Sequence, residues 1–295
     1  MKGIKQIVFI VSILFAVNSY PADETEIILP LHFDKGSPLN SFPTVTIQIQ
    51  NKKLPLVFDT GALHVSLALS KSVLNGLQVG YTSHKFCGYS FSERMCMEEF
   101  IVPEVKLDNF VMKGVRGGEM PYLWGKKSPG FDDTEAAKNG VIGLGLLNQF
   151  GLLIDYSKHI VILTPDYHLP TEYEGNNWMI VPFENPGFTD LYINSSRYKF
   201  GWDTGAIPSI IRLLPEIKDQ AEPCPPDKAY NVNDCHYLNV NSLALEDGQS
   251  FPQTWFLLTK FPNYFKFDGL FGANFFEKHV VFFNFSHHEI LISEN

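Results

Sequence analysis

Hydrophobic and polar residues alternate along several short stretches of the chain, the pattern of strands with one buried face. Residues 44–50 read Thr-Val-Thr-Ile-Gln-Ile-Gln, a strict period of two, and residues 27–33 form another apolar run. A polar Asn-Lys-Lys turn at 51–53 leads into an apolar stretch that ends at Asp59. Short strand patterns joined by turn residues continue through the chain, so the sequence predicts an all-β protein.

The same order of segments is present twice, which indicates an internal duplication. Residues 56–62 read Leu-Val-Phe-Asp-Thr-Gly-Ala, and residues 200–206 read Phe-Gly-Trp-Asp-Thr-Gly-Ala. Residues 140–147 match residues 269–276 at a constant offset of 129, starting from Gly-Val-Ile-Gly and Gly-Leu-Phe-Gly. A duplicated, mostly-β unit of about 130 residues accounts for the sequence that follows the N-terminal segment.

The duplication divides the chain into two lobes. We expect an N-terminal lobe over residues 23–168 that contains Asp59, and a C-terminal lobe over residues 169–295 that contains Asp203. Residues 164–177 are polar and contain two prolines, so they are the expected linker. A chain of 295 residues has room for about two compact units.

Residues 1–22 have the pattern of a secretory signal peptide. Lys2 and Lys5 precede a largely apolar run of eleven residues, 7–17, and the small residues Ser19 and Ala22 follow as alternative cleavage positions. An uncleaved membrane anchor is the alternative, but a run of eleven residues is too short to span a bilayer. The sequence therefore predicts a secreted or periplasmic protein with no stable membrane insertion after cleavage. It leaves no room for a long propeptide before residue 27.

Composition and charge exclude some classes of binding partner. The chain is 45% hydrophobic and 19% charged, so it is globular rather than disordered. Its formal charge is -9 and it contains no basic run, which argues against nucleic acid or an anionic membrane as a partner.

The four cysteines form two local pairs, Cys87 with Cys96 and Cys224 with Cys235. Four cysteines permit three connectivities. Each pair follows its own Asp-Thr-Gly segment at a similar distance, and for that reason we expect the two local disulfides. Zinc is a poor alternative, because neither pair has the Cys-x-x-Cys spacing of a zinc site.

The two Asp-Thr-Gly segments carry the candidate chemistry. A carboxylate at the end of a buried strand is costly unless it is hydrogen-bonded, so packing alone rarely places one there. If a pseudo-two-fold axis brings Asp59 and Asp203 together, the two carboxyls cannot both ionise cheaply and share one proton. The ionised group can activate a water molecule, and the protonated group can donate to an amide carbonyl oxygen. This chemistry needs no metal and no cofactor.

These segments resemble the aspartic proteases of the pepsin and retropepsin superfamily in their bilobal single-chain form. The resemblance rests on residues 59–61 and 203–205 and on the apolar-glycine turns at 141–143 and 270–272. It implies two pseudo-symmetric β-barrel lobes of the six-stranded type, with the active cleft between them. It also implies that Asp59 and Asp203 are catalytic.

The resemblance also implies supporting roles for four further residues. Thr60 and Thr204 are expected to interlock beneath the aspartates, and Gly61 and Gly205 to complete the active-site loops. Each apolar-glycine turn is expected to thread behind the catalytic loop of its own lobe.

The chain departs from the pepsin pattern after each Asp-Thr-Gly. Pepsins have Ser or Thr there, whose hydroxyl supports the ionised aspartate, whereas this chain has Ala62 and Ala206, as retroviral enzymes do. Without that hydrogen bond the aspartates should titrate at higher pH. We therefore expect a mildly acidic activity optimum.

Residues 86–97 are the candidate for the hairpin flap that closes the cleft in this family, with Tyr89 near its tip. A Cys87–Cys96 bridge across the hairpin would stiffen it, which is unusual for a moving flap. His64 follows the first Asp-Thr-Gly and could affect the aspartates, but a solvated histidine is the simpler interpretation.

The leading hypothesis is an endopeptidase that acts on extended, apolar peptide segments and works as a monomer. A non-catalytic peptide- or protein-binding module on the same scaffold is the alternative, because fold does not guarantee function. A processing protease with one physiological substrate would differ only in specificity.

Overall fold

The computed structural model describes residues 26–89, 94–120, 134–184, 187–224, 235–240 and 242–294; residues 1–22, the expected signal peptide, lie outside this part. The described strands are β1 (Ile27–Phe33), β2 (Pro43–Ile49), β3 (Lys52–Asp59), β4 (Leu67–Ser70), β5 (Gly80–Tyr89), β6 (Arg94–Leu107), β7 (Phe110–Met120), β8 (Gly140–Gly143), β9 (Gly151–Asp155), β10 (Ile160–Thr164), β11 (Met179–Pro182), β12 (Phe188–Ile193), β13 (Ser196–Trp202), β14 (Ile210–Arg212), β15 (Glu222–Pro223), β16 (His236–Val240), β17 (Leu243–Ala244), β18 (Thr254–Thr259), β19 (Gly269–Phe271), β20 (His279–Asn284) and β21 (Glu289–Glu294). Short helices join them: α1 (Lys71–Leu74), α2 (Glu135–Asn139), α3 (Leu144–Leu147), η1 (Thr171–Tyr173), α4 (Pro215–Lys218) and α5 (Ala273–Phe276).

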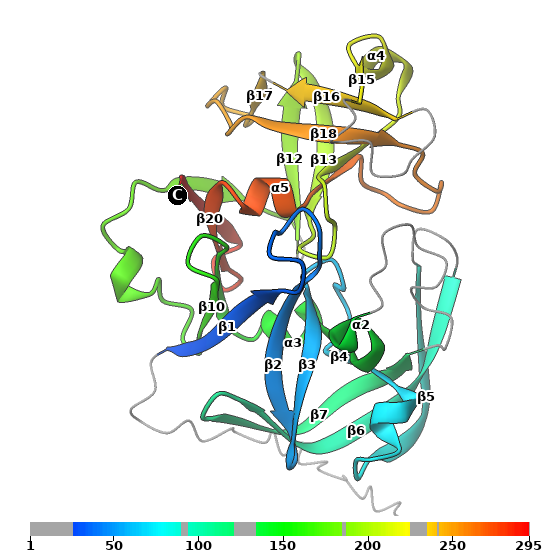
Figure 1. The fold of residues 1–295 in the computed structure, drawn as a ribbon. Coiled ribbons are helices and arrows are strands. Elements are labelled where there is room, and N and C mark those ends of the chain that lie inside the picture. Colours follow the sequence, from blue (N-terminus) through cyan, green and yellow to red (C-terminus); the bar gives the residue numbers. More distant parts are fainter. Residues whose placement is uncertain are drawn as a thin grey trace, which may run out of the picture.

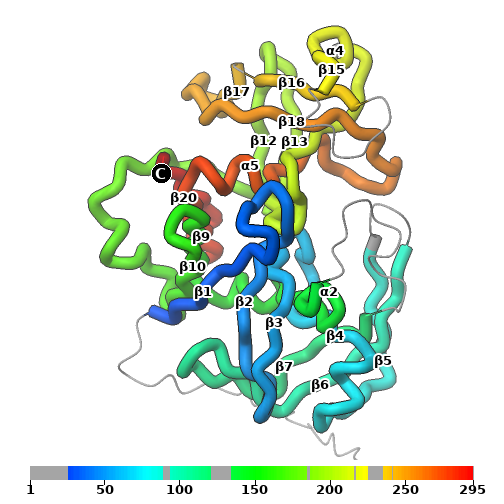
Figure 2. The backbone as a smooth tube through the Cα atoms, viewed as in Figure 1, coloured from blue at the N-terminus to red at the C-terminus, as the bar shows by residue number. Residues whose placement is uncertain are grey.

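The strands form two sheets, ordered β11-β21-β20-β9-β10-β1-β2-β3-β8-β4-β7-β6-β5 and β15-β16-β18-β14-β19-β13-β12-β17. We call β2–β8 the first lobe and β12–β19 the second lobe. The strands β11, β21, β20, β9, β10 and β1 form the connecting sheet. Figure 1 shows the second lobe above and the first lobe below, with strands of the connecting sheet between them, and Figure 2 traces the same path. The predicted all-β, two-lobed fold is confirmed.

The register of the connecting sheet reveals the pseudo-two-fold axis. Leu153 of β9 lies directly opposite Phe282 of β20, and these residues are related by the 129-residue offset of the repeat. Equivalent residues that face each other across an antiparallel pair must lie on either side of the symmetry axis. The axis therefore passes between β9 and β20.

A proline in each half marks where the chain leaves the connecting sheet. Pro30 in β1 and Pro182 in β11 have no N–H to donate, so each is suited to a strand edge or end. The next residue makes the equivalent bond in both halves: Leu31 N–H donates to His159 O at 2.8 Å, and Phe183 N–H donates to His288 O at 3.0 Å. From Leu31 onward β1 pairs with β2, so one strand serves two parts of the sheet.

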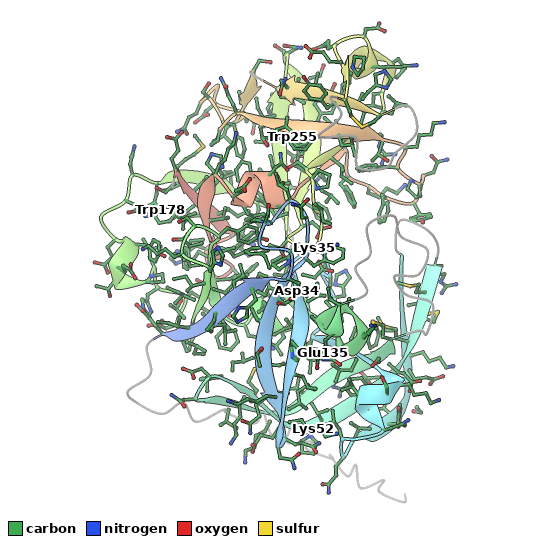
Figure 3. All side chains as sticks on the ribbon, in the orientation of Figure 1. Asp34, Lys35, Lys52, Glu135, Trp178 and Trp255 are labelled. Carbon is green, nitrogen blue, oxygen red and sulfur yellow. A yellow bond between two sulfur atoms is a disulfide. The ribbon has the colours of Figure 1, made fainter. Side chains whose placement is uncertain are left out.

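The hydrophobic core is continuous through both lobes. In β1, buried and exposed residues alternate strictly, which places Ile27, Leu29, Leu31 and Phe33 inside. A smaller cluster forms on the outer side of the connecting sheet, where the segment containing η1 and Trp178 covers Leu153 and Phe282 (Trp178 is labelled in Figure 3).

In the view of Figures 1 and 3, the loop between β1 and β2, which carries Asp34 and Lys35, lies at the height where the two lobes meet. No helix in the described residues is long and apolar enough to cross a membrane.

Candidate active site

Each Asp-Thr-Gly loop follows a strand that has a hydrogen-bonded neighbour on both sides, β3 in the first lobe and β13 in the second. β3 ends at Asp59 and pairs in parallel with β8, while β8 also pairs with β4. In the second lobe β13 ends just before Asp203 and pairs in parallel with β19, which also pairs with β14. The apolar-glycine turns therefore pass beside the Asp-Thr-Gly loop of their own lobe, and Asp203 N–H donates to Phe271 O at 2.9 Å.

Thr60 and Thr204 join the loops beneath the aspartates. Thr60 N–H donates to Thr204 Oγ1 at 3.0 Å, and Thr204 N–H donates to Thr60 Oγ1 at 3.0 Å. Each hydroxyl then donates to a carbonyl across the interface, Thr60 to Trp202 O and Thr204 to Phe58 O, both at 2.8 Å. Both threonines are buried, at 0% and 1% exposure, so these bonds are shielded from water. They fix the two loops relative to each other.

The glycine after each threonine lets the opposite loop approach. A Cβ atom on Gly61 would lie 2.4 Å from Asp203 Cγ, and one on Gly205 would lie 2.8 Å from Asp59 Cγ. Real Cβ atoms do not come so close, so only glycine permits this separation. Each glycine also donates its N–H to the Oδ1 of the aspartate in its own loop, at 2.8 Å in both cases.

The carboxyls of Asp59 and Asp203 lie side by side: the position of a Cβ atom on Gly205 is 2.9 Å from Asp59 Oδ1 and 3.1 Å from Asp203 Oδ1. Burial raises the pKa of Asp59, while the hydrogen bonds from Asp203 and from the Gly61 and Ala62 N–H groups oppose that rise. Burial, followed by the charge of Asp59, raises the pKa of Asp203 well above its ordinary value. Two neighbouring carboxyls of this kind cannot both be charged cheaply, so they titrate as a coupled pair.

No protein-family model and no curated protein matches this chain. Among solved structures, the crystal structure of the aspartic proteinase from Irpex lacteus matches with a TM-score of 0.56. The match covers 92% of this chain and 97% of that chain, at 11% sequence identity. The fold is pepsin-like. At this identity the likeness concerns the fold alone.

A buried polar network supports the second loop of this pepsin-like fold, and sequence reasoning missed it. Ser209 Oγ accepts the N–H of Gly272 at 2.9 Å, and Ser209 N–H donates to Asn274 Oδ1. Asn274 Nδ2 donates in turn to Thr254 Oγ1 at 3.2 Å and to Trp255 O at 2.9 Å. The available signal was the repeat itself, because Asn274 stands where the first lobe has a glycine, at position 145.

Tyr156, the residue after β9, was not singled out from the sequence either. Its ring is buried beside Phe33, with the centroids 4.9 Å apart. Burial raises its pKa well above the usual value, and the charges of Asp203 and Asp59 raise it further. The side chain is therefore a neutral phenol within electrostatic reach of both aspartates.

The candidate flap is a hairpin of β5 and β6, in which Cys87 lies opposite Cys96. The two predicted disulfides, Cys87–Cys96 and Cys224–Cys235, are both present. The hairpin tip at 90–93 and the side chain of Tyr89 lie outside the described part of the chain. His64 is exposed, which agrees with the interpretation as a solvated histidine.

Proposed function

We propose that this protein is an aspartic endopeptidase in which Asp59 and Asp203 hydrolyse peptide bonds. The observation that carries the proposal is the pair of carboxyls, one from each repeated loop, brought side by side by loops that the reciprocal threonine bonds join. A pair that holds one proton can act as acid and base in one step. The pepsin-like fold, shared with an aspartic proteinase, supports the proposal.

In the proposed reaction Asp59 is ionised and Asp203 is protonated. Asp59 takes a proton from a water molecule as the water oxygen bonds to the carbonyl carbon of the substrate, and Asp203 gives its proton to the carbonyl oxygen. When the tetrahedral diol collapses, one hydroxyl returns a proton to Asp203. The C–N bond breaks, and the nitrogen takes the proton from Asp59. Both carboxyls end in their starting states.

The proposed substrate is an extended, apolar peptide segment, and the reaction itself requires no cofactor. The raised pKa values of both carboxyls favour activity in mildly acidic rather than strongly acidic solution. The mature protein is proposed to be an exported monomer, and the two disulfides fit an oxidising compartment.

The test is digestion of a mixed peptide library by the mature protein from pH 3 to pH 7. Asp59→Asn and Asp203→Asn should each lower cleavage by about 10²–10⁴-fold or more, because each removes one half of the acid–base pair. Asp108→Asn is the matched control, since Asp108 is an exposed residue with a φ of 52° in the turn between β6 and β7. This variant should cleave as the wild type does.

Two results would contradict the proposal. Cleavage that survives in both Asp→Asn variants would remove the pair from the mechanism. A folded wild type with both disulfides that binds peptides but cleaves none at any pH would identify a non-catalytic binding module instead.

A further inference from the structure

Tyr156 carries a buried hydroxyl that the proposed reaction does not use. The residue is 2% exposed, and its hydroxyl oxygen has no hydrogen-bond partner among the described residues. A buried polar group without a partner lowers the stability of a fold, so its presence calls for an explanation. The other half of the repeat shows that packing does not require the hydroxyl. Phe285 stands at the equivalent position, 129 residues later, and packs against Phe183 with the ring centroids 5.9 Å apart.

The ring of Tyr156 lies on the inner side of the connecting sheet, towards the lobes. Asp155, directly before it, points to the outer side, where it accepts the hydroxyl of Tyr173 at 2.8 Å. Successive side chains of a strand point to opposite faces, so Tyr156 faces the main core. Its ring centroid is 4.9 Å from that of Phe33 and 5.6 Å from that of Phe276. The phenol is therefore held between β1 and α5.

The helix α5 connects this ring to the second Asp-Thr-Gly-Ala loop. Its first residue, Ala273, donates its N–H to Ala206 O at 2.8 Å. Its last residue, Phe276, contacts the ring of Tyr156. A helix rises about 1.5 Å per residue, so about one helical turn separates the ring contact from the loop. At this range the charges of both aspartates act on the phenol.

The other titratable side chains on the elements around Tyr156 lie elsewhere. Asp155 is on the outer side, and so is the Lys158 ammonium, which lies 4.4 Å from the centroid of the Tyr173 ring. His279, which follows α5, stacks on Phe275 with the centroids 4.3 Å apart. The remaining titratable side chains of these segments are exposed: His32, Asp34, His159, Glu277 and Lys278. The aspartate pair is therefore the charge that acts on the hydroxyl.

We propose that Tyr156 is a positioning residue that favours the ionised form of the aspartate pair. Its hydroxyl dipole turns its hydrogen towards the negative charge of the pair and stabilises that charge from within the core, without touching the substrate. It supplies part of the support that a hydroxyl after each Asp-Thr-Gly would give, where this chain has Ala62 and Ala206. This inference deepens the proposed peptidase function and rests on it.

Tyr156→Phe separates this role from packing, because it removes the hydroxyl and keeps the ring. The variant should unfold at the same temperature as the wild type or at a higher one, since a buried hydroxyl without a partner is gone. Both steps of the coupled titration of the aspartates should move to higher pH, because the ionised forms lose a favourable dipole. We expect about 0.2–0.5 unit, the effect of one dipole on a charge that it does not touch. The pH profile of kcat/KM should move in the same direction.

Tyr173→Phe is the matched control. Tyr173 is also 2% exposed, but its hydroxyl donates to Asp155 on the outer side of the sheet. This variant should unfold at a lower temperature than the wild type and leave the titration of the aspartate pair unchanged. The measurements are NMR titration of ¹³C-labelled aspartate carboxyl carbons and thermal unfolding. Spectra of Asp59→Asn and Asp203→Asn assign the signals of the pair.

Three results would overturn the inference. In the first, Tyr156→Phe leaves both titration steps in place or moves them to lower pH. In the second, Tyr173→Phe shifts the pair as much as Tyr156→Phe does, which would mean that the loss of any buried hydroxyl disturbs the aspartates. In the third, Tyr156→Phe clearly lowers the unfolding temperature, which would assign the hydroxyl a structural role. The NMR titration needs no substrate, so these results are distinct from a failure of the peptidase proposal, which a wild type that cleaves no peptide would show.

Discussion

The two Asp-Thr-Gly-Ala loops make the same hydrogen bonds at the axis, but different groups hold each loop from behind. Each threonine makes the same two kinds of bond across the interface, and each glycine donates to its own aspartate at the same distance. Behind the loop of Asp59, the support consists of backbone groups: Gly143 N–H donates to Ser66 O and Gly145 N–H donates to Val65 O, both at 3.1 Å. Behind the loop of Asp203, it consists of the side chains of Ser209 and Asn274.

The difference shows which part of the duplicated unit is constrained. The two loops bond to each other across the axis, so any change in one loop would have to be matched in the other. The supports lie within one lobe, where a glycine packed on backbone and an asparagine with satisfied hydrogen bonds serve equally well. The halves can therefore differ behind the loops while they remain equivalent at the axis.

The largest effect is expected where the halves are equivalent. Thr60→Val and Thr204→Val should each lower the free energy of unfolding by about 2–4 kcal/mol, because each leaves buried donors and acceptors without partners. The two losses should be nearly equal and not additive in the double variant, since both changes break the same set of bonds. Urea unfolding measures all three variants. Clearly unequal losses for the two single variants would show that the two threonines do not contribute equally to the bonds between the loops.

A smaller effect is expected from exchanging the supports. Asn274→Gly should lower the free energy of unfolding by about 1–3 kcal/mol, because Ser209 N–H and Thr254 lose a buried hydrogen-bond partner. Gly145→Asn should also destabilise the protein, but for a steric reason: a Cβ there would lie 2.8 Å from the backbone carbon of Val65. Thermal unfolding of both variants tests this. Tolerance of either exchange would mean that the supports are interchangeable after all.

The smallest effect is expected from substitutions next to the two carboxyls. Ala62→Ser and Ala206→Ser would each offer a hydroxyl to the aspartate of its own loop and so favour the ionised form. Because burial holds both pKa values above the ordinary value, the added bond should move the acidic limb of the pH–activity profile to lower pH. We expect a shift of about half a unit to one unit. A shift to higher pH would contradict the assigned cause.

Much of this organisation was predictable from the sequence because it is repeated there. The duplicated segments around Asp59 and Asp203 implied an axis, and the constant offset between residues 140–147 and 269–276 related the two halves. In the structure, the repeat-related residues Leu153 and Phe282 lie opposite each other. The local cysteine pairs were predictable for the same reason, since each follows its own Asp-Thr-Gly.

What the sequence did not reveal lies where the halves differ or where distant strands touch. Asn274 supports a buried network, but the strand that brings Thr254 to it is twenty residues earlier in the chain, and one sequence does not show that meeting. Gly118 looks like an ordinary strand glycine until the ring of Phe86 is placed against it. Both roles arise from tertiary contact rather than from local pattern.

The most direct test of the central claim, that Asp59 and Asp203 share one proton across the axis, is NMR titration of aspartate carboxyl carbons in protein labelled with ¹³C. In the wild type, the two aspartates should show a coupled titration in two separate steps, with the upper step above the ordinary aspartate value of about 3.9. Asp59→Asn should lower the pKa of Asp203, because the neighbouring charge that raises it is gone. If both groups titrate independently near the ordinary value, or Asp203 does not respond to Asp59→Asn, the two carboxyls do not form a pair.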